Sequence, residues 1–136
     1  PAAGLEPPEE LFALFDAVPF DAQVEMLTMS IPTATRAEDY LATTKALYQR
    51  GEIQKILEFG LMMTESAMGA EAAGAAAKTF LDTLLTERNR RWVDRLLPRL
   101  AEGDRVVAVG ALHLPGDDGL LALLAAEGFT LRRLPD

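Results

Sequence analysis

The hydrophobic period of the chain changes after Gly103, and this change constrains the fold more than any other feature. Residues 105–109, Arg-Val-Val-Ala-Val, form a short apolar run rich in β-branched side chains. Such a run is typical of a strand buried on both faces of a parallel sheet. A helical pattern over 117–127 and a second strand pattern over 129–134 follow. The order strand, helix, strand predicts a βαβ unit with a right-handed crossover.

Two parallel strands do not make a stable sheet, because such sheets need further strands alongside and cover on both faces. The rest of the chain has helical periodicity, with Pro19 and Gly51 as helix boundaries. We therefore expect an α/β fold, mostly helical, with a helical region over 1–78. An incomplete part over 79–136 would hold a long helix and the βαβ unit. The remaining strands would come from a missing N-terminal half or from a second copy of the chain.

The charge of the chain excludes several classes of partner. Its 136 residues include 13 Lys and Arg against 21 Asp and Glu, for a formal net charge of -8. Such a surface repels phosphate backbones and anionic lipids, so we expect no nucleic-acid partner. No apolar run reaches the roughly 18 to 20 residues of a transmembrane helix. With no cysteine, the chain has neither a thiolate metal site nor a cysteine nucleophile.

His113 is the only histidine, and it lies in a loop directly after the first predicted strand. Sites in parallel α/β sheets form beyond the carboxyl ends of strands. Gly110, which opens the loop, would allow a sharp turn and leave room for a ligand. Imidazole can bind a metal or exchange a proton near neutral pH. The alternative is a histidine that only bonds a backbone carbonyl in a tight turn.

The helix predicted over 79–101 carries polar residues on its apolar face. At 100° per residue, Arg88 and Asn89 fall between Leu85 and Trp92 on a face about 120° wide. Such groups need partners, since a guanidinium buried alone costs several kcal/mol. They either orient two helices or point into a cleft at a carbonyl or oxyanion. Glu87, at the edge of the face, either reaches the same cleft or is solvated.

The C-terminal motifs resemble a known family. Residues 87–92 read Glu-Arg-Asn-Arg-Arg-Trp, residues 106–116 read Val-Val-Ala-Val-Gly-Ala-Leu-His-Leu-Pro-Gly, and residues 119–121 read Gly-Leu-Leu. Their order and spacing resemble the TraB/GumN family, which is related to the Tiki proteases and more distantly to erythromycin-esterase and ChaN-like proteins. Residues 4–31, with Gly-Leu-Glu before two short helices, resemble the middle of the same family.

The resemblance implies a fold of two halves, each giving one GxxH histidine to a shared site. This chain holds only the second, at His113. The family positions carried over are Arg88, His113, Glu87 and Asn89 as catalytic residues, and His113 with Glu6 as metal ligands. Read by itself, Glu6 is an ordinary surface glutamate near the N-terminus.

Tiki-like relatives imply a peptidase-like hydrolase that uses a divalent metal such as Mn, Co or Zn, with a peptide or small-molecule substrate. The isolated chain would then be inactive. ChaN-like relatives imply a haem-binding module instead, and a non-catalytic interaction domain is the third reading. Family members that carry secretion signals imply an extracytoplasmic or periplasmic location. Because the chain begins at Pro1, we expect that an upstream part has been removed.

Overall fold

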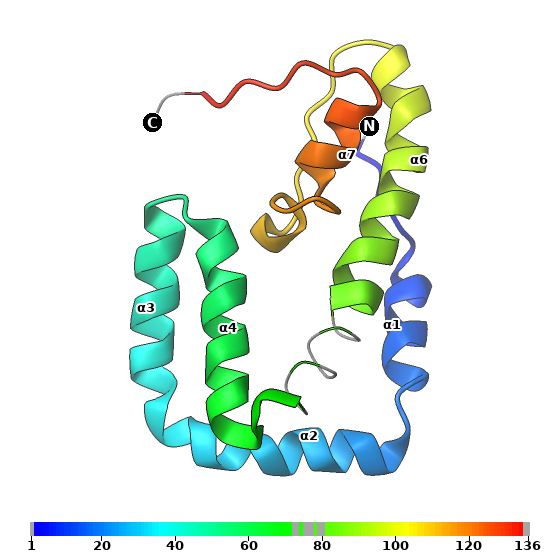
Figure 1. Ribbon diagram of the computed structural model, residues 1–136. Coiled ribbons are helices and arrows are strands. Elements are labelled where there is room, and N and C mark those ends of the chain that lie inside the picture. The colour runs from blue at the N-terminus through cyan, green and yellow to red at the C-terminus, as the bar shows by residue number, and fades with distance from the viewer. Residues whose placement is uncertain (1, 72–73, 75–77, 79–80, 135–136) are drawn as a thin grey trace. The chain divides into compact units, whose positions relative to one another are not determined.

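The computed structural model of the chain describes residues 2–71, 74, 78 and 81–134, and these form helices and loops without a strand (Figure 1). The helices are α1 (Pro8–Asp16), α2 (Phe20–Thr33), α3 (Ala37–Gln49), α4 (Ile53–Met68), α6 (Glu87–Ala101) and α7 (Leu120–Ala126). Two 3₁₀ turns, η1 (Ala34–Arg36) and η3 (Ala111–His113), and a π-helix, η2 (Asp82–Thr86), complete the set. Among these described helices, none has the length and apolar character needed to cross a membrane.

The chain divides into two compact units. Unit 1 comprises Pro1–Leu5 and Phe80–Asp136, and unit 2 comprises Glu6–Thr79. Unit 2 contains α1 to α4, and unit 1 contains η2, α6, η3 and α7.

In unit 2, α3 and α4 form an antiparallel hairpin (Figure 1). Gly51 ends α3 as expected, because its φ of 67° is a conformation that glycine adopts without a steric penalty. The rings of Tyr40 and Phe59 stack between the two helices with their centroids 5.3 Å apart. Leu47 and Ile56 are buried nearer the turn. Aromatic stacking and apolar burial together hold the hairpin closed.

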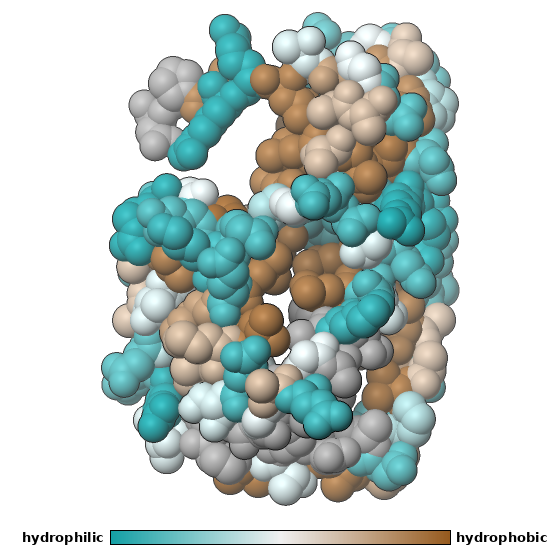
Figure 2. All heavy atoms as spheres, viewed as in Figure 1, coloured by the Kyte–Doolittle hydropathy of each residue, from teal (hydrophilic) through white to brown (hydrophobic). Residues whose placement is uncertain are grey.

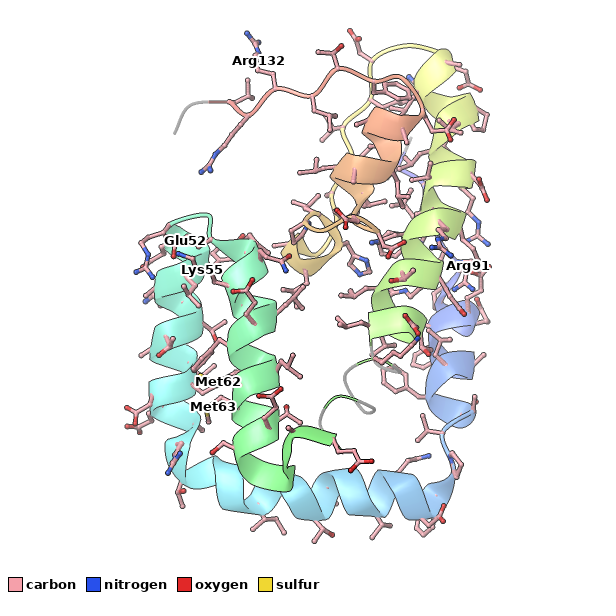
Figure 3. The ribbon with its side chains drawn as sticks, in the orientation of Figure 1. Glu52, Lys55, Met62, Met63, Arg91 and Arg132 are labelled. Carbon is pink, nitrogen blue, oxygen red and sulfur yellow. The ribbon has the colours of Figure 1, made fainter. Side chains whose placement is uncertain are left out.

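The turn of this hairpin carries a small charge cluster, which Figure 3 shows at Glu52 and Lys55. The Glu52 carboxylate lies 3.3 Å from the Lys55 ammonium and 3.3 Å from the Arg50 guanidinium. The hydrogen bond from Lys55, followed by that from Arg50, lowers the pKa of Glu52 below its usual value of 4.5.

We expect Lys55→Met to raise the pKa of Glu52 toward its usual value. A depressed pKa in the folded state stabilises the fold at pH values above 4.5, and this stability is lost as the pH falls through the depressed pKa. An NMR titration of the Glu52 carboxyl measures the shift, with Lys45→Met as the control. An unchanged pKa in Lys55→Met would contradict the assigned cause.

Unit 1 is built on α6, whose buried face packs against α7. Trp92 and Val93 of α6 and Leu120 of α7 form the core cluster, against which Leu5 and Val109 also pack. Figure 2 shows hydrophobic side chains gathered over α7 on the face in view. The burial of Asn89, Trp92 and Leu96 confirms the apolar face predicted for this helix, at the spacing i, i+3, i+7.

The N-terminal segment of unit 1 is bound to the same helix by two arginine side chains. Arg95 donates from Nη1 to the Leu5 carbonyl oxygen at 2.8 Å, and Arg99 donates from Nη1 to the Gly4 carbonyl oxygen at 3.2 Å. Charged donors make the stronger class of hydrogen bond. These bonds therefore hold Leu5 against the core cluster.

The predicted α/β fold class is wrong for the described part of the chain, where no βαβ unit forms. Residues 104–110 and 129–134 lie outside any helix or sheet, and only the helix between the two predicted strands, α7, is present. Val106 is 99% exposed, and Val107 is 41% exposed. The hydrophobic run is that of a buried strand, but a strand needs hydrogen-bonding neighbours. Among the described residues, no backbone hydrogen bond of these segments forms a sheet.

We expect Val106→Lys to change the free energy of unfolding by less than about 0.5 kcal/mol, because the side chain is 99% exposed. In the buried parallel strand first predicted, the same change would cost several kcal/mol. Urea unfolding, monitored by circular dichroism, distinguishes the exposed position from a buried strand. A large destabilisation would contradict the exposure of Val106 and would be the result expected of a buried strand.

Candidate functional site

The site begins where a π-helix runs into α6. At the end of η2, the backbone N–H of Glu87 donates a hydrogen bond to the carbonyl oxygen of Asp82, which lies five residues earlier. One side chain of the following turn, Arg88, donates from Nη1 to the Leu84 carbonyl oxygen at 3.0 Å. π-helical turns are rare and frequently lie at functional sites. Here the π-helical segment supplies the carbonyl that orients the Arg88 guanidinium.

The imidazole of His113 is held by the amide of Asn89 across 24 positions of sequence. His113 is the last residue of the 3₁₀ turn η3. Its backbone N–H donates a hydrogen bond of 3.0 Å to the Gly110 carbonyl oxygen, which closes the turn. Its Nδ1 lies 2.6 Å from Oδ1 of Asn89. Asn89 is 2% exposed and His113 is 7% exposed. Buried polar groups require such partners, so the contact fixes the ring.

The other end of the Asn89 amide binds the loop that follows His113. Its Nδ2 donates to the Asp118 carbonyl oxygen at 2.8 Å and to the His113 carbonyl oxygen at 3.3 Å. The Asp118 carboxylate separately pairs with Arg90 at 2.8 Å, on the exposed side of α6. One amide therefore fastens both the imidazole and its loop to α6.

The loop is compact enough to exclude a side chain at Gly119. A Cβ there would overlap the Pro115 carbonyl oxygen and lie 2.5 Å from the Leu114 carbonyl oxygen. Its φ of -75° is available to any residue, so the requirement for glycine is one of space. This close approach places the Asp118 carbonyl where Asn89 can reach it.

Trp92 connects the imidazole to the guanidinium. Its ring centroid lies 4.4 Å from that of His113, with an angle of 38° between the ring planes. The guanidinium carbon of Arg88 lies 4.7 Å from the Trp92 ring, a distance typical of a cation–π contact. Arg88, Trp92 and His113 thus form a continuous series of contacts in unit 1.

The structure brings some of the predicted site residues into contact with one another. Asn89 and His113 are in direct contact, and Arg88 is linked to them through Trp92. Glu87 is exposed on the first turn of α6. Glu6 belongs to unit 2, ahead of α1.

Two features of the site were missed or misread from the sequence. Gly110 was expected to make a sharp turn, yet its φ of -61° and ψ of 137° are ordinary extended values, which any residue adopts. Trp92 was expected only to line the apolar face of the predicted helix, although it also contacts His113. The spacing of Trp92 and Asn89 on one face was the available signal for that second role.

The residues that the structure describes do not supply a complete set of metal ligands at this site. Catalytic ions are bound by about three protein side chains with one open position. Among the residues that the structure describes, no three His, Cys, Asp or Glu side chains group together in this way. The Asn89 contact at Nδ1 nevertheless resembles the oxygen acceptor that supports most metal-binding histidines.

The comparison with protein families agrees with the motifs of unit 1. The model of the TraB/PrgY/gumN family matches residues 1–133, so the chain belongs to this family. Neither a curated protein nor a solved structure matches the chain.

Proposed function

We propose that this chain supplies one part of a metal-dependent, peptidase-like hydrolase site, with His113 and Arg88 as its acting residues. The observation that carries the proposal is the buried imidazole of His113, held at Nδ1 by Asn89 and packed on Trp92. The Asn89 bond satisfies the buried ring at Nδ1 and fixes its orientation, as a metal-binding or proton-transferring histidine needs. Membership of the TraB/PrgY/gumN family, and the resemblance of its motifs to Tiki-like peptidases, favour hydrolysis.

Each of the two side chains has a role in this proposal. The imidazole of His113 would hold or accept a proton, or act as one ligand of a divalent ion. The guanidinium of Arg88 would bind a substrate carboxylate or the oxygen of the scissile carbonyl, where negative charge develops. A peptide with a free C-terminus has both groups, and a small-molecule ester or amide has the carbonyl.

A divalent ion would need ligands in addition to His113, since among the described residues no three His, Cys, Asp or Glu side chains group together. We propose that a complementary half completes the site, either polypeptide outside this chain or a second copy. Glu6 stays a proposed ligand, and Glu87 and Asn89 stay proposed site residues. Haem binding stays a proposal that rests on the resemblance to ChaN-like proteins, and an extracytoplasmic location stays one that rests on family members with secretion signals.

Calorimetric titration with Zn²⁺, Mn²⁺ and Co²⁺ at high protein concentration tests the proposal. We expect weak binding of at least one ion that His113→Ala reduces by about tenfold or more, which is about 1.4 kcal/mol. Arg90→Ala is the matched control, since it removes only an exposed ion pair beside the site. Unchanged affinity in His113→Ala, or no binding by the parent chain, would overturn the metal role of His113.

A peptidase assay tests the shared site. We expect no peptide hydrolysis by the isolated chain with any of the three ions, even at saturating metal. Hydrolysis by the isolated chain that His113→Ala abolishes would contradict a complementary half that comes from polypeptide outside this chain.

A further inference from the structure

We infer that Asn89 is a positioning residue that determines which ring nitrogen of His113 carries the proton when the imidazole is neutral. The proton would lie on Nδ1, and Nε2 would be the basic nitrogen. The value of this arrangement for catalysis rests on the proposed function. The placement of the proton rests on the geometry around Asn89 alone.

The first step is the orientation of the amide. The two groups within reach of its Nδ2 are the carbonyl oxygens of Asp118, at 2.8 Å, and of His113, at 3.3 Å. Carbonyl oxygens only accept hydrogen bonds, so the end of the amide that faces them must be the donating NH₂ group. The opposite orientation would bring three oxygens together inside a buried cluster.

The second step follows from the first. With Nδ2 facing the carbonyls, Oδ1 faces the imidazole at 2.6 Å from Nδ1. An amide oxygen carries no proton, so the hydrogen of this bond must come from Nδ1. The neutral ring therefore keeps its proton on Nδ1, and its lone pair lies on Nε2.

The third step is the cost of the alternative tautomer. A ring protonated on Nε2 would point the lone pair of Nδ1 at the lone pairs of Oδ1. Because Asn89 is 2% exposed, solvent water does not relieve this repulsion. Turning the amide to repair that contact would break both bonds to the loop. An unsatisfied buried acceptor costs more than a hydrogen bond contributes. The loop carbonyls thus act through Asn89 on the tautomer of neutral His113.

The arrangement has a chemical use. A histidine that binds a metal through one nitrogen usually donates its other N–H to an oxygen, which fixes the ring and raises its basicity. A general base needs the same fixed tautomer. Asn89 supplies this oxygen without a negative charge.

Long-range ¹H–¹⁵N NMR spectra of the ring test the inference directly, and His113 is the only histidine in the chain. At a pH where the ring is neutral, we expect a pyrrole-type nitrogen at Nδ1 and a pyridine-type nitrogen at Nε2. The expected ratio of the two tautomers is about tenfold or more in favour of Nδ1–H, the factor of one buried hydrogen bond. A spectrum dominated by Nε2–H, or an even mixture, would overturn the inference.

Two variants separate positioning from mere structure. We expect Asn89→Ala, if folded by circular dichroism, to lose most of this tenfold preference, whereas Arg90→Ala keeps it because it disturbs only the Asp118 carboxylate. A folded Asn89→Ala chain with the parent tautomer ratio would overturn the role of Asn89. If Asn89→Ala does not fold, the spectrum of the parent chain alone tests whether the proton of the neutral ring lies on Nδ1. No metal is present in these spectra, so their outcome is independent of the calorimetric test of the proposed function.

Discussion

Trp92→Ala should lower the free energy of unfolding by about 3–5 kcal/mol, the range for truncating a buried aromatic side chain. Trp92 is 6% exposed and lies at the centre of the core cluster with Val93 and Leu120. It also supports His113 and Arg88 by ring and cation–π contacts. Removing it leaves a cavity between α6 and α7 and takes away the surface on which both site residues rest. Urea unfolding measures the effect.

The transition must be followed by circular dichroism, because Trp92 is the only tryptophan and its fluorescence is lost in the variant. Leu121→Ala is the matched control, since Leu121 neighbours a core residue but is 45% exposed. We expect it to cost less than about 1 kcal/mol. Equal losses in the two variants would show that Trp92 is not the centre of this core.

Gly119→Ala should cost about 3 kcal/mol, at the upper end of the usual range for overpacking. The new methyl group would overlap the Pro115 carbonyl oxygen, and its closest neighbours are backbone atoms, which cannot rotate away as a side chain would. The loop must then open, and the Asp118 carbonyl moves away from Asn89. The unfolding free energy measures the cost, and the NMR spectrum of His113 reports the damage to the site.

Gly110→Ala is the control for this substitution, at the other end of the same loop. A Cβ at Gly110 would lie 3.6 Å from Cδ2 of His113, which is an ordinary contact, and its backbone conformation suits any residue. We expect a change within about 0.5 kcal/mol. A loss at Gly110 as large as that at Gly119 would contradict the steric argument.

Local features of the fold were predictable from the sequence. Helix periodicity and the boundary at Gly51 depend on neighbouring residues, and the structure confirms both. The apolar face of α6 also follows from spacing alone, including the burial of Asn89. The π-helix ahead of α6 does not, because no residue pattern distinguishes an added residue per turn from an ordinary helix.

The predicted strands failed for a different reason. The pattern at 105–109 reports what the segment could bury, whereas a strand exists only when neighbours accept its backbone hydrogen bonds. Such neighbours are not a property of the segment itself. The same limit applies to the site: the contact between Asn89 and His113 joins residues 24 positions apart, and its geometry depends on the fold.

The exposed valines Val106 and Val107 have a practical consequence for handling the protein. An exposed, β-branched run outside any sheet is the kind of segment from which intermolecular cross-β aggregates grow. The charged residues Asp104 and Arg105, together with the net negative charge of the chain, oppose that growth as gatekeepers. Storage at low ionic strength, away from the isoelectric point near 4.6, should therefore keep stocks clear for longest.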